Sequence, residues 1–103
     1  MRPLVHYILG AVMVVQSSAY TPHPSEGGRI AADGRPARPN YTCAVSRDLK
    51  HLLGKWLHIE GVGKRLAHDV MHKRWERSID ICFPNKKAAN EYGRQKVVIR
   101  EVK

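Results

Sequence analysis

Residues 78–85 read Ser-Ile-Asp-Ile-Cys-Phe-Pro-Asn, and this stretch carries the clearest local pattern in the chain. Ile79, Ile81 and Phe83 share one face of an extended segment while Asp80 lies on the other, which predicts a half-buried strand. The Pro-Asn pair that follows ends the strand, because proline lacks the backbone N–H that a sheet needs. We therefore expect a strand over residues 78–83 that leads directly into a turn.

This strand contains Cys82, and the one other cysteine of the chain is Cys43. In an oxidising compartment, two thiols of a small exported protein most simply pair with each other, so we expect a Cys43–Cys82 disulfide. It would close a loop of about 40 residues and stabilise the domain by about 3–4 kcal/mol on the loop-entropy estimate. The alternative is two reduced, buried cysteines in a cytosolic protein.

The N-terminal stretch, MRPLVHYILGAVMVVQSSA over residues 1–19, has the features of a signal peptide. Arg2 provides a basic start, residues 4–15 are mostly apolar, and small residues at 17–19 precede a cleavage site before Tyr20. The apolar run is too short for a spanning helix. We therefore expect a secreted, extracellular protein. The alternatives for this stretch are an uncleaved anchor or a buried strand.

Composition divides the remaining chain at about residue 40. Residues 20–40 are rich in proline and glycine and hold few sizeable apolar groups, so we expect a flexible N-terminal arm. Asn40 begins an Asn-Tyr-Thr triplet and is the expected N-glycosylation site. Residues 41–103 are then expected to form one small disulfide-stapled domain.

Periodicity leaves two interpretations of the central segment open. In the first, Ser46 caps a helix whose apolar face runs from Leu49 to Leu57, and a second helix carries apolar residues from Leu66 to Trp75, giving a disulfide-stapled helical hairpin. In the second, residues 56–62 and 66–72 are strands that form a sheet with residues 78–83. Residues 88–102 then fit a C-terminal helix packed over the sheet, although Val97-Val98-Ile99 is also compatible with a strand.

The second interpretation resembles the chemokine family. The strand that runs into Cys82, followed by a proline, a Lys-Lys pair and Glu91-Tyr92, is similar to the end of a CC chemokine domain, and residues 43–47 resemble its N-loop. Two of the usual four cysteines are absent, as in the single-disulfide, lymphotactin-like members. The resemblance implies an α+β fold with a three-stranded antiparallel sheet and a C-terminal helix.

By function, the resemblance implies a secreted basic cytokine that binds a seven-helix receptor and is retained on sulfated glycosaminoglycans. The alternative is a small secreted pathogen effector, a β-sandwich with one disulfide, that binds a host protein. The receptor-binding residues implied by the resemblance are Asn40, Tyr41, Thr42, Ala44, Val45, Ser46, Arg47 and Leu49.

The chain is strongly basic, with 18 Lys and Arg against 9 Asp and Glu and a formal net charge of +9. An extracellular domain of that charge favours polyanionic partners, and several cations around Trp75 could converge on one face. No feature indicates specific nucleic-acid recognition. The expected polyanion-binding residues are Lys64, Arg65, Lys73, Arg74, Arg77, Lys86 and Lys87.

No pattern in the chain predicts catalysis or a bound metal. His68 and His72 have the four-residue spacing of a zinc peptidase helix, but Asp69 stands where that motif has its glutamate base, and no third ligand follows. On a strand the two imidazoles would be about 13 Å apart, which is too far to share a metal. We therefore expect a non-enzymatic protein with no metal and no cofactor.

Overall fold

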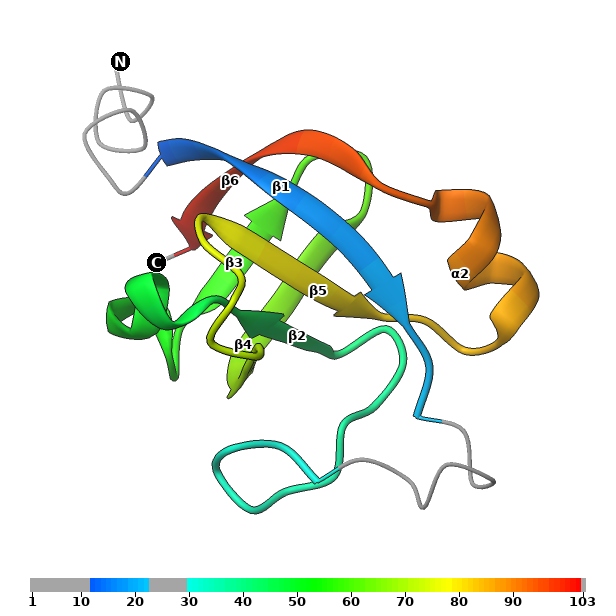
Figure 1. Ribbon diagram of the computed structural model, residues 1–103, viewed down its shortest axis with the longest axis horizontal. Coiled ribbons are helices and arrows are strands. Elements are labelled where there is room, and N and C mark those ends of the chain that lie inside the picture. Colours follow the sequence, from blue (N-terminus) through cyan, green and yellow to red (C-terminus); the bar gives the residue numbers. More distant parts are fainter. Residues whose placement is uncertain (1–11, 23–29, 103) are drawn as a thin grey trace.

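The computed structural model describes residues 12–22 and 30–102, and within them six strands close into a barrel (Figure 1). In ring order the strands are β1, β5, β2, β4, β3 and β6. The strands are β1 (Val12–Tyr20), β2 (Thr42–Val45), β3 (Trp56–Ile59), β4 (Gly63–Val70), β5 (Ser78–Cys82) and β6 (Gln95–Val102), and the helices are the 3-10 helix η2 (Arg47–Leu52) and α2 (Lys86–Tyr92).

Two of the strand pairs are parallel, β1 with β5 and β2 with β4, and the other pairs are antiparallel. Parallel neighbours cannot be joined by a tight hairpin, so the chain must cross between distant parts of the ring. Ring closure also means that no strand presents an unpaired edge. Strands distant in sequence are therefore neighbours in space, as β1 and β6 are in Figure 1.

The barrel interior is filled by alternate side chains of the strands. Val15 of β1, Ile79 and Ile81 of β5 and Ile99 of β6 are at most 1% exposed and belong to one hydrophobic cluster. Leu52 of η2 joins the same cluster. Full burial of such a side chain contributes about 1.5–3 kcal/mol, so this interior is the main source of stability.

The expected chemokine-like fold is wrong, and so are the helical-hairpin and β-sandwich alternatives. The strands expected over 56–62, 66–72 and 78–83 are present as β3, β4 and β5, but they are joined by β1, β2 and β6 in a closed ring. The C-terminal helix is limited to α2, because Gly93 ends it with a positive φ of 65°, which glycine adopts readily. Residues 95–102 then form strand β6.

Strand β1 lies where the end of a signal peptide was expected. It pairs with both β5 and β6, and it buries Val15 and Ser17. The Ser17 hydroxyl donates a 2.8 Å hydrogen bond to the Gln95 carbonyl oxygen. For residues 12–20 the structure thus agrees with the buried-strand alternative, while residues 1–11 lie outside the described part. Cleavage after Ala19 would remove most of β1 from the ring.

Residues 30–40, the described part of the expected flexible arm, fold against the barrel. Ile30 forms a bridge with Pro36, and the Ala31 N–H donates a 2.8 Å hydrogen bond to the Arg35 carbonyl oxygen. Ala31 and Ala37 are buried. The expectation of flexibility over residues 23–29 falls outside the described residues. Within residues 12–22 and 30–102, no helix has the length and apolar character needed to span a membrane.

The expected Cys43–Cys82 disulfide is not present, and both side chains are buried thiols. The strand register explains this, because Cys43 of β2 lies opposite Ile81 of β5. Successive side chains of a strand point to opposite faces, so Cys82 faces away from the barrel interior that Cys43 enters. Burial raises the pKa of the Cys43 thiol to about 12, which removes its nucleophilic thiolate at neutral pH.

We expect neither thiol to react with iodoacetamide in the folded protein, and both to react after unfolding in urea under non-reducing conditions. Mass spectrometry of the alkylated chain checks this. A reductant should leave the urea midpoint unchanged, because there is no crosslink to break. A crosslinked peptide pair, or a urea midpoint that falls on reduction, would show that the Cys43–Cys82 disulfide forms.

Candidate functional site

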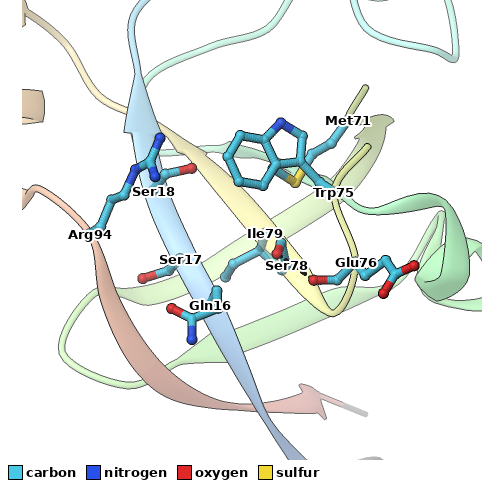
Figure 2. Close-up of a pocket in the computed structure, with 9 residues that line it drawn as sticks. All are labelled: Gln16, Ser17, Ser18, Met71, Trp75, Glu76, Ser78, Ile79 and Arg94. Atoms are coloured by element: carbon cyan, nitrogen blue, oxygen red, sulfur yellow. Dashed lines mark hydrogen bonds between the residues drawn. The ribbon is translucent and has the colours of Figure 1, made fainter. Parts of the chain in front are cut away.

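A groove lies on the outer face of strands β1 and β5, between the β4–β5 loop and the end of α2. It comprises two hollows of about 270 and 410 Å³ that share Ser18, Met71, Trp75 and Arg94 in their walls. Figure 2 shows the side chains around the smaller hollow, which come from β1, from the β4–β5 loop and β5, and from the turn after α2. Segments distant in sequence thus form one surface depression.

The floor of the groove carries a carboxylate. Asp80 points outward because its neighbours Ile79 and Ile81 fill the barrel interior, and strand side chains alternate between faces. The β1–β5 register places Ser18 opposite Asp80, and the Ser18 hydroxyl donates a 3.0 Å hydrogen bond to Asp80 Oδ1. This bond fixes the half-buried carboxylate against strand β1.

An aromatic ring with two cations forms one wall of the groove. The half-buried indole of Trp75 is approached by the guanidinium carbons of Arg74 and Arg94, at 5.2 and 5.3 Å from the ring centroid. The backbone N–H of Trp75 donates a 3.0 Å hydrogen bond to the His72 carbonyl oxygen, which closes a turn. Arg94 follows directly after Gly93 at the end of α2. Local turns on both sides therefore bring these three side chains together.

The far end of the β4–β5 loop is fastened to the barrel. Arg77 has a φ of 44°, and its backbone N–H donates to Asp48 Oδ2 at 3.0 Å. Hydrogen bonds from the Ser46 hydroxyl and the Arg77 N–H lower the pKa of the Asp48 carboxyl, and the nearby Arg77 charge adds to this effect. The loop that carries Trp75 is thus anchored where it enters strand β5.

A second polar cluster fastens residues 30–40 to strand β4. Asp69 is 5% exposed, and its Oδ1 accepts hydrogen bonds from the Ala32 N–H at 3.0 Å and the Val70 N–H at 2.8 Å. Asp33 Oδ1 lies 3.0 Å from His68 Nδ1. Hydrogen bonds from the Arg35 backbone N–H and from His68 hold the pKa of the Asp33 carboxyl far below its ordinary value of 3.8.

The same cluster has the outline of a nucleophile, base and acid, but its geometry excludes that role. Thr42 Oγ1 lies 2.7 Å from His68 Nε2, and Asp33 Oδ1 is hydrogen-bonded to His68 Nδ1. Thr42, however, has an exposed fraction of 0%, and its hydroxyl also accepts a 2.9 Å hydrogen bond from the Arg38 N–H. A substrate cannot reach it, so the cluster holds residues 30–40 in place.

The structure does not support the expected receptor-binding segment. Most of its residues are buried in β2 and η2, where they pack inside the barrel or against it and cannot meet a partner. Asn40, Tyr41 and Arg47 keep accessible surface, and glycosylation of the exposed Asn40 stays a prediction. The buried members are Thr42, Ala44, Val45, Ser46 and Leu49.

The expected polyanion-binding cations do not form one cluster around the groove. Lys64 and Arg65 lie on β4, and the Lys64 amine is 5.3 Å from the ring centroid of Trp56. Lys86 and Lys87 begin α2. Among the seven, only Arg74 lines the groove as the structure describes it. No group of three metal-ligating side chains occurs among residues 12–22 and 30–102.

Sequence reasoning identified Trp75 and the outward position of Asp80 but not the groove that they share. It missed Ser18, which was assigned to a cleavage site, and Arg94, which was assigned to a continuous C-terminal helix. The signal that could have revealed Arg94 is the glycine before it, since a glycine there favours a helix end. No local signal distinguishes the serines of a strand from those of a cleavage site.

The chain is similar in sequence to a curated bacterial protein and in fold to a solved expansin structure. No family model matches the chain. It is 32% identical over 93 residues to the "Putative cell wall shaping protein YabE" of Bacillus subtilis, covering 88% of this chain and 23% of that protein. The chain therefore spans about a quarter of the length of this curated relative.

Among solved structures, a mutant expansin of Clavibacter michiganensis in complex with cellohexaose matches with a TM-score of 0.57 and 13% identity. The match covers 90% of this chain and 51% of the expansin chain, and at this identity it shows the fold alone. Together with the closed barrel, these findings show that the chemokine resemblance is wrong. The expected seven-helix receptor, the sulfated glycosaminoglycan and the cytokine function are wrong with it, and the pathogen-effector alternative is not supported either.

Proposed function

We propose that this barrel binds a strand of cell-wall polysaccharide in the groove between the β4–β5 loop and α2. The observation that carries the proposal is the pairing of an aromatic wall, Trp75, with a carboxylate floor, Asp80 fixed by Ser18, in one depression. Binding sites for small and extended ligands commonly combine apolar walls with a few fixed polar groups.

The indole of Trp75 and the carboxylate of Asp80 match the two kinds of surface that a sugar ring offers, its C–H face and its hydroxyl groups. The C–H face of a pyranose is apolar and packs on an indole, whose large flat surface gives contact area at low entropy cost. Sugar hydroxyls donate hydrogen bonds to carboxylates, and bonds to a charged acceptor are stronger than neutral ones. A groove that joins both elements therefore suits a polysaccharide better than an apolar ligand.

The comparisons support the choice of ligand. The Bacillus relative is named for cell-wall shaping, and the expansin of similar fold was crystallised with a cellulose fragment. Both agree in coarse terms with a location outside the cytoplasm, at the cell wall. The lack of enzymatic activity is part of the proposal.

We expect Trp75→Ala to weaken binding to purified bacterial cell walls and to cellohexaose by roughly tenfold or more, because a buried aromatic contact is worth about 1–3 kcal/mol. Co-sedimentation measures binding to cell walls, and isothermal titration measures binding to cellohexaose. Trp56→Ala is the matched control, since Trp56 lies on β3 and does not line either hollow. Equal losses from both variants, with circular dichroism unchanged, would contradict the proposal.

A second candidate function is cleavage of the bound strand, and one observation favours it. Asp80 and Glu76 are two carboxylates that line the connected hollows, and glycoside hydrolysis uses a carboxylate pair around the scissile bond. The same incubations distinguish the functions. Cleavage would release soluble fragments with new reducing ends, and Asp80→Asn would abolish this release.

A further inference from the structure

Resting on the proposed function, we infer that the groove selects acidic polysaccharide strands, whose sugars carry carboxylates, through the guanidinium groups of Arg74 and Arg94 beside Trp75. Arg74 comes from the β4–β5 loop and Arg94 from the turn after α2. Both guanidinium groups contact the same indole, at 5.2 and 5.3 Å from its centroid. A sugar ring that reaches Trp75 therefore meets two cations.

Neither cation is neutralised within the part of the chain that the structure describes. Ion pairs there join Arg35 with Asp33 and Lys55 with Glu101, whereas Arg74 and Arg94 have no carboxylate within ion-pair distance. Both side chains are exposed at the rim of the groove. Their charges are thus available to a ligand, and stacking on an indole holds a guanidinium in a defined place.

The chemistry of the groove favours a carboxylated sugar over other anions. Guanidinium groups bind carboxylates and phosphates alike through paired N–H donors. The floor and the neighbouring wall, however, carry the carboxylates of Asp80 and Glu76. These repel a densely charged polyphosphate but accept hydrogen bonds from sugar hydroxyls. A strand with hydroxyls toward the floor and spaced carboxylates at the rim satisfies both surfaces.

The overall charge of the chain assists this selection but does not explain it. A formal net charge of +9 attracts any anionic wall polymer from a distance and raises the association rate. Such attraction is shared among all exposed cations and is screened by salt. Selection by Arg74 and Arg94 depends instead on their fixed position beside Trp75. Variants that remove equal charge at different places therefore separate the two effects.

The test uses the full chain and a matched pair of ligands, oligogalacturonate and its methyl ester, in which methylation removes the charge of the carboxyl groups. We expect the acidic strand to bind the wild-type protein at least roughly tenfold more tightly than the ester. The double variant R74Q/R94Q should lose that preference, so that it binds the acidic strand no more tightly than it binds the ester. Isothermal titration at physiological and at high salt measures both.

The control is K73Q/K96Q, which removes the same charge from exposed lysines that line neither hollow. It should retain the preference for the acidic strand. Equal loss in both double variants would mean that net charge alone acts and would overturn the inference. So would tighter binding of inorganic polyphosphate than of oligogalacturonate. If cell walls and cellohexaose bind but the acidic strand gains nothing over its ester, only the inference fails. If no glycan binds at all, the proposed function fails with it.

Discussion

A chain that lacks residues 1–19 is expected not to fold, because the deletion removes strand β1 up to its final residue. Strands β5 and β6 would each lose a neighbour, and the ring would open beside the interior filled by Val15. A small domain is stable by only about 5–15 kcal/mol, and the loss of one central strand with its hydrogen bonds exceeds that margin. Circular dichroism and dispersion of amide resonances measure the outcome.

The matched control is deletion of residues 1–11, which leaves every described strand intact. We expect that shorter deletion to keep a cooperative urea transition. A folded, cooperative chain beginning at Tyr20 would show that the barrel does not need β1, and it would agree with the cleaved leader that the sequence suggested. The experiment therefore decides between the two roles of this stretch.

The substitution Ile81→Ala is expected to destabilise the protein by about 2–5 kcal/mol, the usual range for truncating a fully buried aliphatic side chain. Ile81 has an exposed fraction of 0% and lies between Ala19 of β1 and Cys43 of β2 in the strand registers. Its removal leaves a cavity that the ring cannot close without shifting strands on both sides. Urea denaturation measures the change in the free energy of unfolding.

The control for this prediction is Ile30→Ala, which makes the same chemical change at a side chain that is 65% exposed. Surface truncations of this kind usually change stability by less than about 0.5 kcal/mol. If the two variants were equally stable, Ile81 would not occupy the barrel interior. A change in the dependence on urea concentration, without a change in midpoint, would instead indicate an altered unfolded state.

Several features of the fold follow from local sequence. The alternation of Ile79, Asp80 and Ile81 specifies a strand with one apolar face, because strand side chains point alternately to opposite faces. Gly93 ends α2 because its φ of 65° is readily adopted by glycine and costly for other residues. The basic and aromatic composition of the β4–β5 loop predicts a binding surface around Trp75, and this binding stays a prediction.

Local sequence could not predict that residues 12–20 form strand β1 of the barrel. An apolar run followed by small residues is typical of a signal peptide, and it is equally typical of a strand that packs in a barrel and carries serines near its end. Composition reports how much apolar surface a segment must bury, but not against what. Here β5 and β6, more than 50 residues away, provide the cover for β1. Only the tertiary pairing shows that choice.

The cysteines illustrate the same limit. Count and compartment favoured a disulfide, but pairing depends on which faces the two side chains occupy. The β2–β5 register aligns Cys43 with Ile81, and a shift of one residue would have aligned it with Cys82 instead. Since a one-residue shift moves every side chain to the other face, register decides the chemistry of both thiols.

The sequence by itself predicted strand β5, the basic charge and the outward carboxylate of Asp80, and it offered β3 and β4 as one of two interpretations. It did not predict that α2 ends at Gly93. The tertiary structure alone decided that six strands close into a ring and that Ser18, Trp75, Asp80 and Arg94 line one groove. The physical reason is that periodicity records burial along a single element, whereas a barrel and its groove arise from contacts between segments that the linear pattern does not connect.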